Sequence, residues 1–459
     1  MNAKQYILIP LALVALLWQG CKDALEFPLE NEISASEAIQ TAEDLLQLLT
    51  SCYDVVGNTF NGHSQNFHEL LGPNLDNPNN DDYTEAWNHS TLFFNGTIKD
   101  FYKQPYIAIY RCNTILENFD LVTGLDAATQ TQMEAEARFI RAMCHWDVVR
   151  LFAHPYGFTP GNTHNGIVIS TSTSNDLLPR NTVAEVYDHI TEDLNFAISN
   201  LPNENGNYAT AWAAKALMAK VRMQMMDYAG AYEMANDVIN NSGITLDPDS
   251  LLATRFSPQL SGEGIFNIIS TSNADNRASK FSDNYRQDNN DNPAMRCAPE
   301  LVTLFQAVPT DKRSGWISVK NAGTESEFYA IAKFDNDYAN VPYIHMTDIT
   351  LLRAECSARA GIDLAQAIAD VNAIKTRAYG GTANNLPGGS SADAIVEAAQ
   401  YERRLEMCFE GDWFNHLRRR GVEGETITIR DDPWNCEGMN LQFPVSERSD
   451  VFEMNPSGC

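Results

Sequence analysis

YERRLEMCFEGDWFNHLRRRG, residues 401–421, contains three carboxylates at a regular spacing. Glu402, Glu406 and Glu410 are four residues apart, so a single α-helix would place them on one face, where like charges repel one another. Such a row needs compensation, either from a cation in a metal or catalytic site or from arginines elsewhere in the fold. The rest of the chain has to decide between these alternatives.

Arginines are abundant in this stretch and in one other helical segment. MEAEARFIRAMCHWDVVRLFA, residues 133–153, repeats apolar residues at intervals of three and four and carries Arg138 and Arg141 on an adjacent face. A guanidinium can hold a carboxylate through two hydrogen bonds and stays charged when it is removed from water. We therefore predict a buried or half-buried ion-pair network, structural in role, that joins the two segments through Arg138, Arg141, Glu402, Glu406 and Glu410.

The composition is that of a globular protein with an acidic surface. Of 459 residues, 44% are hydrophobic and 20% charged, and the formal net charge is −28. This share of apolar residues excludes disorder of the whole chain. We expect no nucleic-acid partner, because phosphate binding needs clustered Lys and Arg.

Residues 1–20 have the features of a signal peptide: Lys4 near the start, an apolar run from Tyr6 to Leu17, and Gly20 before Cys21. The run is shorter than the about 20 residues that a membrane-spanning helix needs. LWQGC, ending at Cys21, resembles the bacterial lipobox, in which the chain is cut before the cysteine and its sulfur is acylated. We expect an anchor on Cys21, where each buried methylene contributes ~0.8 kcal/mol.

The eight cysteines after Cys21 contain no CxxC pair, which disfavours zinc ribbons and thioredoxin-type redox sites. Cys436 and Cys459 are 23 residues apart and are the one pair that we suggest as a disulfide. We expect no metal ion and no cofactor.

Helical periodicity dominates the first half and the last quarter of the chain. Two segments, 208–243 and 349–380, each predict a pair of helices with small residues at the contact, similar to tetratricopeptide repeats. The strand signal is weak and is clearest at residues 264–270. We predict a mainly α fold, a scaffold of helical hairpins with long irregular loops and few short strands. Further helices are expected near residues 36–56, 98–119, 183–199 and 391–408.

Long stretches without a clear pattern separate the helices, at residues 57–97, 154–181, 243–343 and 421–459. Loops of this length inside a compact domain are usually functional. Aromatic residues lie there among amides and carboxylates, a combination that offers flat apolar faces beside hydrogen-bonding groups. We predict solvent-facing ligand-binding residues in the insertions near 57–97 and 243–343: Tyr83, Trp87, Tyr285, Trp316, Asn77, Asn80, Asp82 and Asn289.

Three motifs carry a resemblance to a known family. EARFIRAMCHWDVVRLFAHPYG at residues 136–157, ERRLEMCFEGDWFNHLRRRG at 402–421 and QFPVSERSDVFEMNP at 442–456 occur in this order. With the lipobox, they resemble the SusD/RagB-like outer-membrane lipoproteins of Bacteroidetes over nearly the whole chain. Departures are local: Trp413 replaces a common Arg, and His154 with Pro155 interrupts the run into Gly157.

The resemblance implies a single tetratricopeptide-like domain over residues 21–459 without catalytic activity. Such a protein would be lipid-anchored in the outer membrane, facing the cell exterior, and would deliver a glycan to a SusC-like TonB-dependent transporter. Some relatives capture peptides, so a receptor for peptides or other oligomers is the alternative.

A surface hydrolase is a third, weaker alternative. The sequence has no HExxH, GxSxG or GxxxxGK[ST] motif. Carboxylates one helical turn apart can nevertheless reach the roughly 5 to 5.5 Å that a retaining glycosidase needs, so spacing does not exclude this chemistry. Two acidic runs, Asp76 to Asp82 and Asp288 to Asp291, are rich in calcium-type oxygen ligands but lack the EF-hand order, and we interpret them as solvated loops.

Overall fold

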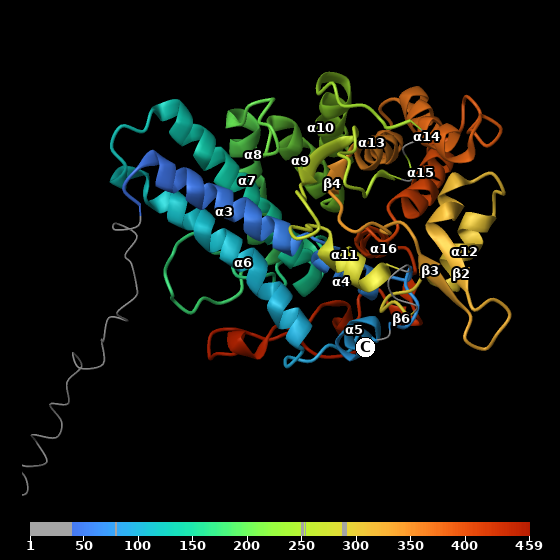
Figure 1. Ribbon diagram of the computed structural model, residues 1–459, viewed down its shortest axis with the longest axis horizontal. Helices are drawn as coiled ribbons and strands as arrows, with labels where there is room; N and C mark the ends of the chain where they lie inside the picture. The colour runs from blue at the N-terminus through green and yellow to red at the C-terminus, as the bar shows by residue number, and fades with distance from the viewer. Residues whose placement is uncertain (1–38, 79, 249–251, 253, 287–291) are drawn as a thin grey trace, which may run out of the picture.

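The computed structural model describes residues 39–78, 80–248, 252, 254–286 and 292–459 (Figure 1). The predicted signal peptide and Cys21 lie outside the described residues, and so do Asn79, Asn289 and the acidic run 288–291. The predictions that depend on them stay predictions.

The scaffold is a row of helices in which each packs against the next, from α3 at one side of the molecule to α15 at the other (Figure 1). Both predicted hairpins are present, as α9 with α10 and as α13 with α14. The mainly α prediction is confirmed. The row consists of α3 (Ala42–Thr59), α6 (Gly96–Glu117), α7 (Ala127–Phe152), α8 (Val183–Asn200), α9 (Ala211–Gln224), α10 (Tyr228–Asn241), α13 (Met346–Ala360), α14 (Leu364–Tyr379) and α15 (Ala392–Glu406).

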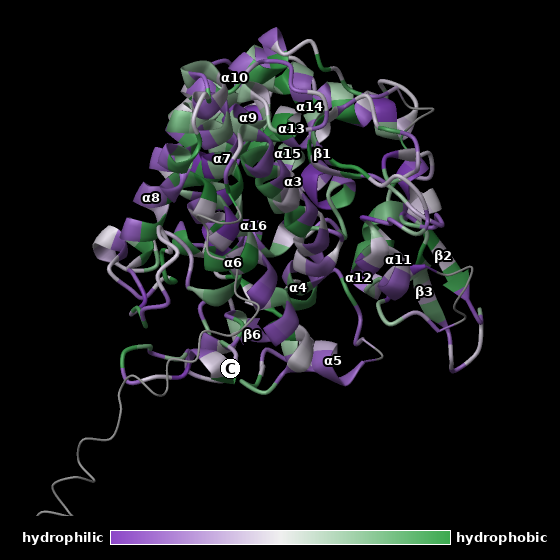
Figure 2. Ribbon diagram, turned by 60° about the vertical axis from the view of Figure 1, so that its left-hand side comes forward, coloured by the Kyte–Doolittle hydropathy of each residue, from purple (hydrophilic) through white to green (hydrophobic). Residues whose placement is uncertain are grey.

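Local sequence fixes where several of these helices begin and end. Capping boxes start two of them: Thr41 with Asp44 at α3, and Thr182 with Glu185 at α8. Gly361 ends α13 in the left-handed conformation, which leaves room for the short turn into α14. Figure 2 shows hydrophilic and hydrophobic residues mixed along the helical ribbons, as expected for helices with one buried face.

The stretches between these helices contain more regular structure than their sequences indicate. Short helices occur in them as α4 (His63–Leu71), α5 (Asp81–Trp87), α11 (Ser279–Tyr285) and α12 (Pro299–Gln306), with 3₁₀ turns η1 (Phe119–Leu121), η2 (Pro160–Asn162), η4 (Lys312–Trp316), η5 (Glu437–Met439) and η6 (Val445–Glu447). Three two-stranded antiparallel sheets pair β1 (Gly264–Ile268) with β4 (Val341–His345), β2 (Ile317–Lys320) with β3 (Phe328–Ile331), and β5 (Thr428–Ile429) with β6 (Asp432–Pro433). The strand predicted at 264–270 is β1.

Residues 401–421 form two helices rather than one. Helix α15 ends at Glu406, and α16 (Trp413–Val422) begins after a turn in which Phe409 and Gly411 have φ of 67° and 79°. Glu410 lies in this turn, so it does not share a helix with Glu402 and Glu406. The expectation of three carboxylates on one helix is wrong for the third.

A single large hydrophobic cluster extends from Ile39 to Phe452, and a smaller, alanine-rich one lies between α13, α14 and α15. The suggested disulfide between Cys436 and Cys459 is present and holds the last residue of the chain to the segment before η5. Among the helices that the structure describes, none combines the length and the apolar character needed to cross a membrane.

Candidate functional site

The acidic row is buried inside an ion-pair network. The side chains of Glu402 and Glu406 have no exposed surface. Glu406 accepts hydrogen bonds from Arg255 at 2.8 Å, Arg377 at 2.9 Å and Arg313 at 3.3 Å. Glu402 lies 2.8 Å from Arg313 and 3.1 Å from Lys375.

Glu410 joins the same network from the turn after α15. Its carboxylate lies 2.5 Å from the Lys333 ammonium and 3.0 Å from Nε2 of His345. Burial alone would raise the pKa of Glu410, but Lys333 and His345 outweigh it and lower the pKa to about 2. For Glu406, the guanidinium groups of Arg377, Arg255 and Arg313 likewise overcome burial and lower the pKa.

The expected partners Arg138 and Arg141 belong to a different part of the molecule, which corrects the prediction. Arg141 holds Asp193 of α8 through two hydrogen bonds of 2.8 Å, and Arg138 pairs with Glu134 and Asp193. The reason is topological: α7 packs on α6 and α8, whereas α15 packs on α13 and α14. The carboxylate row therefore ties α15 and the turn after it to α14, η4, β4 and the segment before β1, and does not join the two motifs.

These contacts give the row a structural role. All three carboxylates are buried or nearly so and are engaged by cationic side chains. A glycosidase acid and base must instead flank a cleft that admits the sugar. Within the described residues, the cavity that Glu410 lines has a volume of about 30 Å³, which is too small for a sugar ring, so the hydrolase alternative loses the observation on which it rested.

The structure also contradicts the expectation that the loop aromatics face solvent. Tyr285 is fully buried among Phe281, Phe334 and Phe409, and Trp316 is 4% exposed and covered by Lys333, whose Nζ lies 4.4 Å from the ring centroid. Their polar sequence neighbourhood suggested exposure. Tyr285 belongs to the short helix α11 and Trp316 to the 3₁₀ turn η4, and each is on the buried face of its element.

Near residue 80 the expected binding residues serve α5 and its neighbours. Tyr83 is buried and accepts a hydrogen bond from Asn284, and Asn80 caps the helix by accepting from the backbone of Tyr83. Asp82 accepts from the backbone and the hydroxyl of Thr97. Trp87 is half-buried, with the Arg430 guanidinium 4.8 Å from its ring centroid, and Asn77 is exposed. A ligand role for Trp87 and Asn77 stays a prediction.

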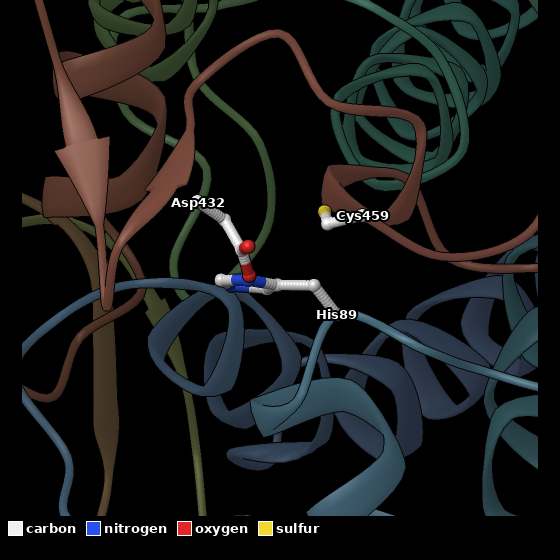
Figure 3. A group of neighbouring side chains, drawn as sticks. All are labelled: His89, Asp432 and Cys459. Carbon is white, nitrogen blue, oxygen red and sulfur yellow. The ribbon is translucent and has the colours of Figure 1, made fainter.

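One group of potential metal ligands occurs in the part of the chain that the structure describes: His89, Asp432 and Cys459 (Figure 3). Both ring nitrogens of His89 are within hydrogen-bond distance of other groups: Nδ1 is 2.7 Å from the Asp432 carboxylate, and Nε2 is 3.2 Å from the Leu71 carbonyl oxygen. The sulfur of Cys459 is bonded to Cys436. The group is therefore a hydrogen-bonded contact beside a disulfide, without a free thiolate to bind a metal ion.

A groove of about 1180 Å³ runs along α6 in the part of the chain that the structure describes. Helix α6 contributes one wall, α3 the second, residues 168–178 the third, and the C-terminal segment 444–452 closes one end. Lining residues run from Lys99 to Thr114, roughly 22 Å of helix at about 1.5 Å per residue. We call this cavity the α6 groove.

A row of tyrosines follows the α6 groove. Tyr102, Tyr106 and Tyr110 succeed one another at intervals of four residues, so they lie on one side of the helix. Tyr102 is buried with its ring 5.0 Å from that of Tyr106, while Tyr110 is 51% exposed. The row thus leads from the core to the open end of the cavity.

Two hydrogen-bonding residues of α6 fix the third wall. Tyr106 donates to the Val168 carbonyl at 3.0 Å, and the Asn113 amide donates to the carbonyls of Ser170 and Ser172 at 3.1 and 3.2 Å. Beyond these contacts the same wall exposes Leu177 and Leu178. The α6 groove therefore combines aromatic faces, apolar side chains and polar groups in a concave surface, as ligand sites do.

Comparisons with known proteins place the chain in a family. One family model, described as "Starch-binding associating with outer membrane", matches residues 27–223, and a second, described as "SusD family", matches residues 306–450. The chain belongs to the SusD/RagB family. The resemblance of its motifs to this family is confirmed.

Two curated SusD-like proteins are similar in sequence. SusD-like protein P25 of Formosa agariphila is 28% identical over 160 residues, which cover 34% of this chain and 28% of that protein. A SusD-like protein of Bacteroides ovatus is 26% identical over 261 residues, covering 52% of this chain and 45% of the relative. The matched regions thus span less than half of each relative.

Solved SusD-like structures share the fold over nearly the whole chain. A SusD superfamily protein from Bacteroides vulgatus superposes with a TM-score of 0.80 at 20% identity, covering 92% of this chain and all of that one. A laminarin-binding SusD-like protein superposes with a TM-score of 0.71 at 19% identity, covering 91% and 100%. These likenesses show the fold.

None of the residues that line the α6 groove belongs to the insertions near 57–97 and 243–343, where we expected a ligand. A sequence signal for the groove did exist. Tyr102, Tyr106 and Tyr110 recur every four residues in a segment whose helical periodicity was clear. Aromatic rings at that spacing usually indicate a core stripe, and only the neighbouring Lys99 and Lys103 distinguish this one.

Proposed function

We propose that this protein is a cell-surface glycan-binding lipoprotein that holds its ligand in the α6 groove and passes it to a SusC-like TonB-dependent transporter. The observation that carries the proposal is the tyrosine row along a cavity of about 1180 Å³. Tyrosine rings stack on the apolar faces of sugars, and their hydroxyl ends accept or donate hydrogen bonds. The cavity slightly exceeds the roughly 300–1,000 Å³ of typical small-ligand sites, which suits an oligosaccharide segment.

The comparisons support a glycan as the ligand. The family description that matches the first half of the chain names starch binding, and one protein of the same fold binds laminarin. The same description names association with the outer membrane, in agreement with a lipid anchor on Cys21.

Tyr110→Ala tests the ligand site. Tyr110 is exposed, so its loss should leave folding intact while removing one stacking surface that is worth about 1 kcal/mol, or roughly fivefold in affinity. Affinity gel electrophoresis against a panel of polysaccharides, including laminarin and starch, identifies a ligand. Isothermal titration with its oligosaccharides then measures the change.

Tyr208→Ala is the matched control, because Tyr208 is 42% exposed and does not line the α6 groove. We expect the control to bind like the wild type. Equal affinity of the wild type, Tyr110→Ala and Tyr208→Ala for a glycan would refute this site, and binding of peptides with no affinity for any glycan would refute the ligand class.

Cys21→Ala tests the anchor and the partner. Without the acylated sulfur, the protein should leave the membrane fraction and no longer co-purify with a TonB-dependent transporter from solubilised outer membranes. Retention of Cys21→Ala in the outer membrane would contradict lipid anchoring at this residue.

A further inference from the structure

The α6 groove contains cationic side chains that no carboxylate neutralises. Lys99 and Lys103 line it and are exposed, and within the described residues neither side-chain ammonium group has an ion-pair or hydrogen-bond partner. Arg111 donates to the backbone carbonyl of Ser51 at 2.8 Å, so its charge is also left without a carboxylate. The groove lining carries three cations and three carboxylates, whereas the whole chain has a formal net charge of −28, so the groove is locally rich in cations for this protein.

Lysines elsewhere in the protein are commonly paired. Lys215 contacts Asp237, Lys333 contacts Glu410 and Lys375 contacts Glu402. Acidic residues are abundant enough to supply partners for the groove lysines as well. A shortage of carboxylates in the chain therefore does not explain why the groove lysines lack ion-pair partners.

Three acidic residues also line the α6 groove, and none of them forms an ion pair with Lys99 or Lys103 within the described residues. Asp44 accepts hydrogen bonds from the backbone and the hydroxyl of Thr41, both at 2.8 Å, and lies at the N-terminus of α3, where the helix dipole favours negative charge. Asp176 accepts from the Ser174 hydroxyl at 2.6 Å. Glu447 is partly buried, and this burial raises the pKa of its carboxyl.

The cations lie beside the tyrosines at regular intervals. Lys99 and Lys103 are one helical turn apart, about 6 Å along the axis, and Arg111 follows about 12 Å further on. Tyr106 and Tyr110 project from the same side of α6 as the two lysines, since all four fall within a narrow sector of the helix. A glycan stacked on the tyrosines would present its substituents to these ammonium groups.

We propose that the α6 groove selects acidic glycans, whose sugar rings carry carboxylate or sulfate groups that Lys99 and Lys103 bind. This inference rests on the proposed function and names the ligand class for the same site. A lysine ammonium on its flexible stem contacts either kind of anion as a point charge, so the shared chemistry is a negatively charged substituent on the sugar. Because the pairs form at an exposed surface, added salt weakens them.

The test compares three probes by isothermal titration at low and high salt: neutral laminarin oligosaccharides, oligogalacturonate for the carboxylate, and sulfated carrageenan oligosaccharides for the sulfate. The wild type is measured beside the double variant Lys99→Gln/Lys103→Gln. The control Lys280→Gln/Lys320→Gln changes the net charge equally at two lysines outside the groove. All four side chains are at least partly exposed, and circular dichroism verifies that each variant is folded.

We expect the wild type to prefer at least one anionic probe to laminarin, and the groove double variant to lose about fivefold of that affinity. The control should bind like the wild type, and high salt should reduce anionic binding only where the groove lysines are present. The stronger anionic probe identifies whether carboxylate or sulfate is the natural substituent.

Equal or tighter binding of laminarin, unchanged in the groove double variant but weakened by Tyr110→Ala, would overturn this inference and leave the proposed function standing. Absence of binding to every glycan tested would overturn both. Binding of an acidic polypeptide such as polyglutamate, with no glycan bound, would show that the lysines serve a peptide and would also overturn both.

Discussion

Glu406→Gln removes a negative charge from the centre of the ion-pair network and keeps nearly the same side-chain volume. Three guanidinium groups contact this buried carboxylate, from Arg255, Arg313 and Arg377. The glutamine amide keeps one oxygen as an acceptor but turns an NH₂ donor toward groups that are themselves donors. The change therefore takes one carboxylate contact from each of the three guanidinium groups and places an amide donor against them.

The size of the effect follows from what each arginine retains. Breaking a buried ion pair by removing one partner costs about 3–5 kcal/mol. Arg255 and Arg377 both keep contacts to Glu263, at 2.7 and 3.0 Å, and Arg313 keeps Glu402 at 2.8 Å. Because every arginine still has a carboxylate, we expect the lower end of the range, about 3 kcal/mol of lost unfolding free energy.

Urea unfolding followed by circular dichroism measures this loss, with Glu397→Gln as the matched control. Glu397 is an exposed residue of the same helix, so its substitution should change stability by less than about 0.5 kcal/mol. Glycan affinity of the folded Glu406→Gln protein should equal that of the wild type. A variant as stable as the control, with lost binding or lost hydrolysis of a polymer, would show that Glu406 is functional and not structural.

Two further predictions concern the same core. Burial opposes ionisation of Glu263 and Glu410, but their cationic partners lower both pKa values from 4.5 to about 2. Each ionised carboxylate therefore contributes roughly 3 kcal/mol to the free energy of unfolding, fully present above pH 4.5 and lost as the pH falls toward 2. The urea midpoint should drop steeply between pH 4.5 and 3, and a flat profile there would contradict these shifts. Gly411→Ala should destabilise the protein by about 2 kcal/mol or more, because φ is +79° and the new Cβ would lie 2.8 Å from the Cα of Gln65. The control is Gly424→Ala, at a position with φ of +97° and open space around it. Equal melting temperatures of the two variants would show that the contact with Gln65 is unimportant.

The scaffold could be predicted because its signals are local. The apolar repeat at residues 133–153 lies inside α7, and the two hairpins predicted from small residues are α9 with α10 and α13 with α14. The break after Glu406 could not be predicted, because Phe409 adopts a positive φ that phenylalanine rarely takes. Tertiary packing imposes that conformation, and the sequence does not signal it.

The partners of the acidic row were missed for a related reason. Arg255 is 151 residues from Glu406 and Arg313 is 93 residues away, and neither belongs to a motif. The charge pattern correctly predicted that guanidinium groups would compensate the row. Which arginines contact the carboxylates depends on how the segments between the helices pack against α15, and this tertiary packing is not visible in the sequence.

The exposure of the loop aromatics also depends on tertiary contacts. Tyr285 and Trp316 stand in polar surroundings in the sequence, yet the side of α11 and of η4 that carries them is the buried one. A short helix of seven residues has too few positions for its periodicity to reveal which face is inside. The α6 groove was equally hidden, because its walls come from segments separated by up to about 400 residues.

The misassigned Arg141 links the scaffold to the proposed site. Its guanidinium holds Asp193 with two hydrogen bonds and reaches the Asn113 side-chain oxygen at 2.9 Å, while the Asn113 amide group holds the carbonyls of Ser170 and Ser172 in the groove wall. With its oxygen bound to Arg141, the amide has one orientation, and its NH₂ group must point at the wall. Through Arg141, helix α7 thus supports one wall of the α6 groove, although Arg141 itself does not line it. If the groove is the ligand site that we propose, its specificity can change through Lys99 and Lys103, because their side chains take no part in these hydrogen bonds.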